Sequence, residues 1–258
     1  MIVRTVKVSL RAVRRSVVVG LALLAAGCAT PPPAPPAPEG APADFPTIDL
    51  SGLASQADVH LVDATASMLR ARVYRSGALA RLGHDHVLDA GEVGGVVWID
   101  AARAGERAVR AELYLALANM VVDDPQSRAE ESFETEPDDE AREGTRRNML
   151  ASLDAASHPY ARVELEAVLS ESVLDALGNG EEVDVPATAT VRVAGGAHEL
   201  PLSVRVTLQD GVVVGAGEFQ VRHTDFGIEP FSVMGGALSV KDEIDLRFRV
   251  TARQEDLS

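Results

Sequence analysis

The sequence predicts an all-β fold, an antiparallel barrel or sandwich of about eight strands with a short helical excursion. Hydrophobic and polar side chains alternate along several segments, with the period of two that is typical of half-buried strands. The clearest alternating segments are residues 183–193, 200–208 and 244–252. Two turn signals, Gly195-Gly196 and Asp210-Gly211, separate consecutive segments and predict antiparallel hairpins.

Residues 1–27 have the composition of a secretory signal peptide. Five basic residues and no acidic one lie in the first fifteen positions, and the uncharged apolar run Ser16–Ala26 follows them. This run is too short for a transmembrane helix, which needs about 20 residues. It ends at Ala-Ala-Gly-Cys, which resembles the cleavage site of bacterial lipoproteins. We therefore expect Cys28 to be the site of lipid attachment, on the periplasmic face of the bacterial outer membrane; an unlipidated protein would be periplasmic.

Residues 28–57 are rich in proline and alanine. The stretch 31–46 has too few large apolar side chains to form a core, and its prolines favour extended polyproline II. We expect this segment to be a tether that holds a folded domain, residues 58–254, away from the membrane.

The alternating pattern predicts further strands in the folded domain, in addition to the two hairpins. These strands are expected at residues 67–75, 91–100, 108–118, 160–170 and 239–252. A turn centred on Gly195-Gly196 would pair Val191 with Leu200 and would place the apolar partners of both strands on one face.

The Asp210-Gly211 turn adds a third strand to the same sheet. Its register would pair Leu202 with Phe219 and would place His198 beside His223 on the inner face. The inward series of this strand contains Gly215 and Gly217, which mark a bend or leave internal space.

Residues 123–158 are the exception to the strand pattern. This segment is acidic, lacks alternation and contains good helix formers. Asp124 is placed to cap a helix whose first position is Pro125, and Thr145 could cap a second helix. We expect a helical insertion between two strands.

Composition and motifs exclude several classes of function. The net charge of −15 argues against a nucleic-acid partner, which requires a basic surface. A single cysteine excludes a disulfide framework. Neither a G-x-S-x-G elbow nor an H-E-x-x-H helix occurs. The sequence therefore favours a binding protein over an enzyme.

His84 and His86 form the most conspicuous candidate site. With one residue between them they would face the same way in a strand, and such a pair can bind a transition metal when a further ligand is present. The candidates for that ligand are His198, His223, Asp85 and Asp225. The alternatives are contacts to a lipid headgroup, or polar caps hydrogen-bonded to the backbone at a barrel mouth. Polar caps are the favoured interpretation, and no resident metal is predicted.

Five segments resemble, in order, the YceI-like family of lipid (polyisoprenoid)-binding proteins. They are LVDATASMLRARVYR (61–75), GEVGGVVWID (91–100), TRRNMLASLDAASHPYARVEL (145–165), ATVRVAGGAHELPLSVRV (189–206) and GEFQVRHTDFGI (217–228). The chain departs from the family pattern in its lipoprotein-like leader, its long acidic insertion, the pair of histidines in GHDH, and His223 in place of an arginine.

The resemblance implies an extended eight-stranded, lipocalin-like antiparallel barrel whose apolar tunnel holds a polyisoprenoid, a quinone-like molecule or another amphiphilic lipid, without a further cofactor. The candidate lining residues are Trp98, Leu113, Leu115, Leu117, Val163, Leu165, Gly217, Phe219 and Phe226. The candidate headgroup or polar-mouth residues are His84, His86, His198 and His223. Two alternatives stay open: a periplasmic metal-binding module that uses His84 and His86, and a structural lipoprotein with a filled barrel.

Overall fold

The computed structural model describes residues 57–101 and 106–254. The predicted signal peptide, Cys28 and the predicted tether up to residue 56 lie outside these described residues. The described chain is mostly β-structure with three short α-helices, which confirms the predicted fold class. None of the described helices is long and apolar enough to cross a bilayer.

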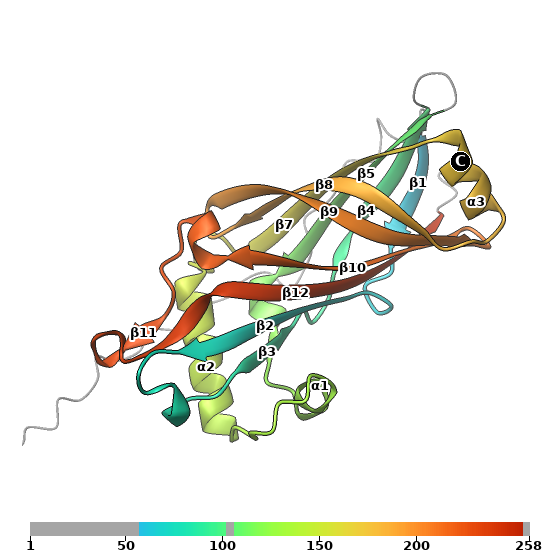
Figure 1. The fold of residues 1–258 in the computed structure, drawn as a ribbon. Helices are drawn as coiled ribbons and strands as arrows, with labels where there is room; N and C mark the ends of the chain where they lie inside the picture. Colours follow the sequence, from blue (N-terminus) through green and yellow to red (C-terminus); the bar gives the residue numbers. More distant parts are fainter. Residues whose placement is uncertain (1–56, 102–105, 255–258) are drawn as a thin grey trace, which may run out of the picture. The chain divides into compact units, whose positions relative to one another are not determined.

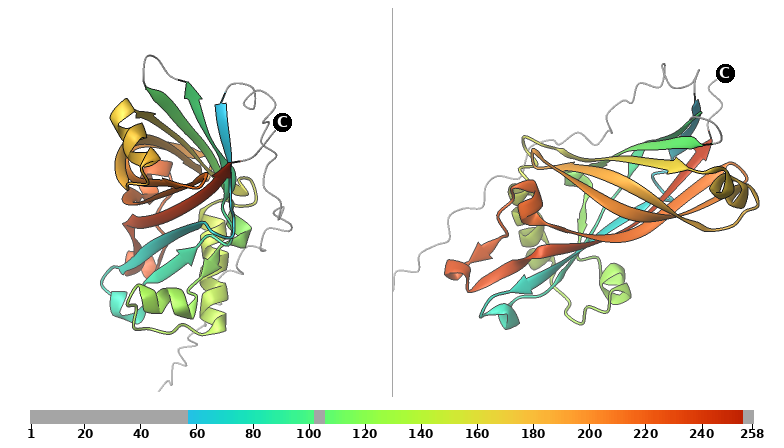
Figure 2. Two further views of the ribbon diagram at one scale, coloured as in Figure 1. Left: turned by 90° about the vertical axis from the view of Figure 1, so that its right-hand side faces the viewer. Right: turned by 45° about the horizontal axis from the view of Figure 1, so that its top comes forward.

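Eight antiparallel strands close into a barrel (Figure 1, Figure 2). They are β1 (Ala57–Val62), β4 (Gly94–Ala101), β5 (Arg107–Ala116), β7 (Tyr160–Leu169), β8 (Val183–Val193), β9 (Gly196–Gln209), β10 (Val212–Arg222) and β12 (Leu238–Gln254). The ring closes at β1, which pairs with β4 on one edge and with the end of β12 on the other. The sequence did not predict β1.

Three shorter strands continue the sheet beyond the ring. β12 pairs with β2 (Met68–Ser76), β2 pairs with β3 (His86–Asp89), and β3 pairs with β6 (Val121–Val122). The chain passes from β1 to β2 through a turn in which the carboxylate of Asp63 accepts hydrogen bonds from the amides of Thr65 and Ala66. β2, β3 and β6 therefore form an extension of the sheet that leaves the barrel along β12.

The remaining elements are short. The helices are α1 (Pro125–Glu130), α2 (Asp139–Ser152) and α3 (Glu171–Gly178). The other elements are β11 (Ser232–Val233) and the 3₁₀ turns η1 (Ala80–Leu82), η2 (Leu117–Asn119), η3 (His223–Phe226) and η4 (Met234–Gly236). α2 and α3 lie at opposite ends of the barrel (Figure 1), and these ends are called the α2 end and the α3 end below.

The predicted helix caps are right for α1 and wrong for α2. The carboxylate of Asp124 accepts hydrogen bonds from two amides of the first turn of α1, as predicted. α2 begins at Asp139 rather than near Thr145, because Asp138 supplies the cap by accepting from the amide of Ala141. α3 was not predicted.

The turn between β8 and β9 lies one residue earlier than the sequence predicted. Ala194 and Gly195 occupy the turn with φ of 52° and 76°, the left-handed conformation that a two-residue hairpin turn requires. Val191 therefore pairs with His198 and not with Leu200.

Gly196, the first residue of β9, must be glycine for a steric reason. A β-carbon at Gly196 would lie 2.2 Å from the backbone oxygen of Phe226, so only glycine permits this close approach of two backbones.

The β9–β10 hairpin has the predicted register next to its turn. Val213 pairs with Leu208, and the pairing continues to Ala216 opposite Arg205. The ladder between these two strands stops there, so the expected pairing of Leu202 with Phe219 falls beyond it.

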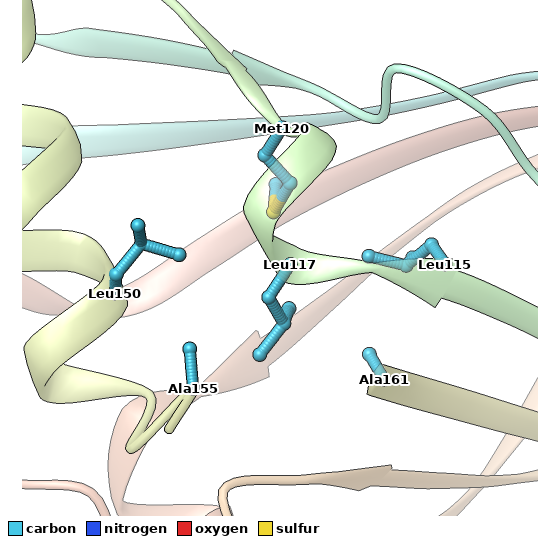
Figure 3. Close-up of a cluster of buried hydrophobic side chains, with 6 residues drawn as sticks. All are labelled: Leu115, Leu117, Met120, Leu150, Ala155 and Ala161. Atoms are coloured by element: carbon cyan, nitrogen blue, oxygen red, sulfur yellow. The ribbon is translucent and has the colours of Figure 1, made fainter. Parts of the chain in front are cut away.

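A cluster of buried hydrophobic side chains lies at the α2 end (Figure 3). Leu150 of α2 and Ala155 after it pack against Leu117 and Met120, which follow β5. Leu150 and Leu117 are almost inaccessible to solvent. The helical insertion therefore contributes to a hydrophobic core at this end of the barrel.

An ionic network fixes α1 against the outer face of the extension. The guanidinium of Arg70 lies 2.6 Å from Asp89 and 2.9 Å from Glu130. Glu131, which caps α1, binds Arg70 and Arg247, each at 3.1 Å. Arg70 is buried and its charge is compensated by three carboxylates, so this buried cation is well paired, and loss of Arg70 itself would remove the link between β2 and α1.

Replacing Gly196 with alanine should destabilise the protein, because the added β-carbon cannot fit beside Phe226. We expect the free energy of unfolding to fall by about 1–3 kcal/mol in chemical denaturation. Gly178→Ala is the control, since nothing lies within 4 Å of its β-carbon position, and it should not lower stability, because alanine suits the helical conformation of α3 better than glycine. Equal losses in both variants would contradict the importance of this contact.

Candidate functional site

The barrel interior contains two adjoining cavities. The larger, of about 150 Å³, extends toward the α3 end, where Leu174 and Leu177 contribute to its wall. The smaller, of about 60 Å³, lies nearer the α2 end beside Leu115 and Ala161. The residues shared by both walls are Leu113, Leu165, Phe248 and Val250. The two cavities are therefore neighbouring lobes of one interior space.

Strand alternation explains why this space is apolar. Each barrel strand points every second side chain inward, and on β7 these are Ala161, Val163, Leu165, Ala167 and Leu169. No charged side chain is among the described residues that line either lobe. Many of the inward residues are small, because valine, alanine and glycine recur on β8 and β10, and small side chains leave the centre of the barrel hollow.

Five of the predicted lining residues lie on the cavity walls. They are Leu113, Leu115, Val163, Leu165 and Phe219.

Three predicted lining residues lie elsewhere. Val97 and Ile99 line the larger lobe, so Trp98 between them belongs to the outer face of β4. Leu117 packs in the hydrophobic cluster at the α2 end. Phe226 lies in η3, where its ring packs into a separate cluster.

Gly217 faces the interior, but the ring of Phe248 occupies the space beside it. A β-carbon there would lie 2.8 Å from the ring of Phe248. The ring of Phe248 packs edge-on against Phe219, with centroids 6.1 Å apart. Gly217 therefore makes room for Phe248 rather than for a ligand, and Phe248 forms part of the wall of both lobes. Its inward position was evident from the alternation along 244–252, although it was not among the predicted lining residues.

The structure brings His84 and His86 together and adds a partner that the sequence did not indicate. Their rings lie 4.6 Å apart between centroids. His86 Nδ1 lies 2.7 Å from Oδ2 of Asp123, and His84 Nε2 lies 3.9 Å from the same oxygen. Asp123 is completely buried. These three residues are called the His-His-Asp cluster below.

Backbone and side-chain groups hold Asp123 in the cluster. Its Oδ1 accepts hydrogen bonds from the amide of Val87, at 3.0 Å, and from the guanidinium of Arg128. Burial alone would raise the pKa of Asp123, but the hydrogen bond from His86 and the other donors more than offset it and lower that pKa. Burial lowers the pKa of His84, and repulsion from His86 adds to this effect.

The other predicted polar residues do not join the cluster. The carboxylate of Asp85 accepts a hydrogen bond from the amide of Arg75 at 2.8 Å. His198 Nε2 lies 3.8 Å from Oδ2 of Asp225, and His223 Nδ1 lies 2.9 Å from the carbonyl oxygen of Asp242. His223 follows the end of β10 and is part of a 3₁₀ turn. The expected pairing of His198 with His223 is therefore wrong.

A further buried histidine lies on β1. His60 is 4% exposed, and its Nδ1 has no hydrogen-bond partner among the described residues. It pairs with Val97, whose side chain lines the larger lobe. Burial lowers the pKa of His60 below its ordinary value.

Comparisons with known proteins agree with this architecture. The family model for the YceI-like domain matches residues 90–252. A solved polyisoprenoid binding domain from Saccharophagus degradans, implicated in plant cell wall breakdown, is similar to 76% of the chain over 98% of its own length, with 15% identity and a TM-score of 0.52. The structure of BcnA from Burkholderia cenocepacia covers 74% of the chain and 98% of its own, with 14% identity and a TM-score of 0.46. The search of curated proteins found no match.

The buried His60 should make stability depend on pH. Its pKa is lowered in the folded state, so the unfolded chain binds a proton first as the pH falls below about 6.5. The free energy of unfolding should therefore decrease between about pH 7 and pH 5. His60→Leu should flatten that decrease, measured by chemical denaturation at a series of pH values. An unchanged slope in the variant would contradict this role.

Proposed function

Because the chain belongs to the YceI-like family, we propose that it binds a polyisoprenoid, a quinone-like molecule or another amphiphilic lipid inside its barrel. In this proposal the protein carries or sequesters the lipid and does not transform it. The observation that carries the proposal is the two-lobed interior walled by aliphatic and aromatic side chains.

An apolar chain is the ligand that such walls favour. Each methylene group moved from water into an apolar space contributes about 0.8 kcal/mol, and no polar partner is needed to hold it. A charged or strongly hydrogen-bonding ligand would lose its hydration in these lobes without replacement. The similarity in fold to a domain described as polyisoprenoid binding supports the same class of ligand.

A long lipid requires more space than the two lobes offer as they stand. Their volumes are about 150 Å³ and 60 Å³, whereas pockets for drug-sized ligands are typically about 300–1,000 Å³. The ring of Phe248 borders both lobes. We infer that the ring of Phe248 moves aside and that the barrel widens when the ligand enters, so that the two lobes join and enlarge.

We also propose that the protein is exported and held at the periplasmic face of the outer membrane by a lipid on Cys28, or is periplasmic if it is not lipidated. The basic leader, the short apolar run and the proline-rich segment support this location. A membrane-tethered barrel would exchange lipid with the bilayer beside it.

A bulky side chain in the larger lobe should displace the lipid. Ala187 is buried and lines this lobe, whereas the next residue, Thr188, is exposed on the outer face of the same strand. We expect Ala187→Phe to reduce bound lipid at least about tenfold, since its ring occupies ligand space. Thr188→Phe is the matched control and should retain the lipid of the natural protein.

The measurement is mass spectrometry of organic extracts of the purified full-length chain, together with the unfolding temperature of each variant. Ala187→Phe should unfold within a few degrees of Thr188→Phe if the lobe can accommodate the ring. A natural protein without extractable lipid, combined with strong destabilisation by Ala187→Phe, would instead favour a structural lipoprotein with a filled barrel.

Cys28→Ser should abolish lipid attachment. The thiol is the acceptor in lipoprotein processing, so the variant should no longer incorporate a labelled fatty acid and should leave the membrane fraction. Metabolic labelling and fractionation of cells that express either chain provide the measurement. Equal labelling of both chains would refute the anchor.

A further inference from the structure

We propose that the His-His-Asp cluster binds a divalent transition-metal ion, with His84, His86 and Asp123 as its protein ligands. The proposal does not depend on the lipid ligand, because none of these residues lines either lobe of the interior. Two imidazoles and one carboxylate form a set of donors that suits Zn²⁺ and similar ions.

The distances within the cluster are close to those of a bound ion. One ligand atom from each of the three residues lies within 4.8 Å of the others. Ligands at about 2.0–2.2 Å from a tetrahedral ion are separated from one another by about 3.3 Å. The His86–Asp123 separation of 2.7 Å would lengthen, and the His84–Asp123 separation of 3.9 Å would shorten. These two changes are about 0.6 Å each, and the third pair of ligand atoms, on His84 and His86, lies within 4.8 Å, so side-chain rotation must also bring the imidazoles closer together.

The chain holds the carboxylate in the orientation that the ion requires. Asp123 has a φ of 53°, an uncommon conformation for a residue other than glycine, and the amide of Asp123 donates to the carbonyl oxygen of Val87 at 2.8 Å. Val87 and Arg128 occupy Oδ1 of the carboxylate. Oδ2 is therefore directed toward the two imidazoles, and such outer partners commonly orient metal ligands.

His84 gives the second, independent observation. Its Nε2 is buried and has no hydrogen-bond partner among the described residues. A polar cap bonded to the backbone, which the sequence favoured, would have such a partner. A buried nitrogen without a partner is costly, and an ion coordinated by Nε2 would remove that cost.

Arg128 limits the affinity but does not exclude the ion. Its charge is shared with the carbonyl oxygens of Asp85, at 2.7 Å, and Thr135, at 2.8 Å, in addition to Asp123. The guanidinium binds the opposite carboxylate oxygen, away from the imidazoles. His84 and His86 are partly exposed, with 25% and 16% of their side chains accessible, so an ion can enter and a water molecule can take the fourth position.

Zinc titration of the full-length chain tests the proposal. The protein is treated with a chelator, dialysed and titrated with ZnCl₂ by calorimetry, and Co²⁺ is then used for its absorption spectrum. We expect about one equivalent of Zn²⁺ per chain and a Co²⁺ spectrum typical of four ligands. His84→Phe should weaken zinc binding at least about 100-fold, whereas His158→Phe, which alters a half-exposed histidine outside the cluster, should not.

The unfolding temperature distinguishes lost ligation from misfolding. Without metal, His84→Phe should unfold within a few degrees of the natural protein, because the lost nitrogen has no partner. Zn²⁺ should raise the unfolding temperatures of the natural protein and of His158→Phe, and it should not raise that of His84→Phe. His84→Gln should behave like His84→Phe. A natural protein that binds no stoichiometric zinc, or a His84 variant that binds it equally well, would overturn the proposal. Extracted lipid should be the same in all these chains, so failure of one proposal leaves the other separately testable.

Discussion

The long strand β12 is the constraint on which the rest of the structure depends. One edge of β12 pairs with β10 from Glu243 to Arg253. Its other edge is divided, since β2 pairs with it up to Arg249 and β1 pairs with it from Ala252 onward. Because β12 is longer than its neighbours, one part of this edge pairs with β1 and closes the barrel, and the other part pairs with β2 and begins the extension. From Ile244 to Ala252 alternation keeps the apolar side chains of β12 on the inner face, and a register shift against β2 lies between Val240 and Ile244.

The distribution of side-chain size along the barrel decides where it is packed and where it is hollow. Large side chains gather at the α2 end, where the insertion adds Leu150 and where η3 adds Phe226. At the α3 end Leu177 packs against Leu169 and Val185. Between these clusters the inward residues are mostly valine, alanine and leucine. The α3-end cluster also borders the hollow, because Leu169, Leu177 and Val185 line the larger lobe.

The sequence predicted most of the barrel because alternation and turn glycines are local signals. The prediction was wrong or incomplete where the alternation of apolar and polar side chains was ambiguous. The run that contains Trp98 is hydrophobic on both faces, so alternation could not decide which side is inward. β1 is short and contains His60, which weakens its pattern. No local sequence signal identified Asp123 as a partner of His86, because the two residues are 37 positions apart in the sequence. Their contact depends on the left-handed backbone of Asp123 and on the buried Arg128, which binds its carboxylate.

The interrupted ladder between β9 and β10 has a mechanical consequence. Beyond Ala216 and Arg205 no regular backbone pairing joins these strands in the described chain, and Pro201 on β9 has no amide hydrogen to donate. Spreading the wall along this line breaks no regular ladder beyond Ala216, whereas spreading it between β10 and β12 requires a continuous ladder to break. The barrel is therefore unequally stiff around its circumference, and a compliant seam runs beside Leu202 and Phe219, on the wall of the smaller lobe.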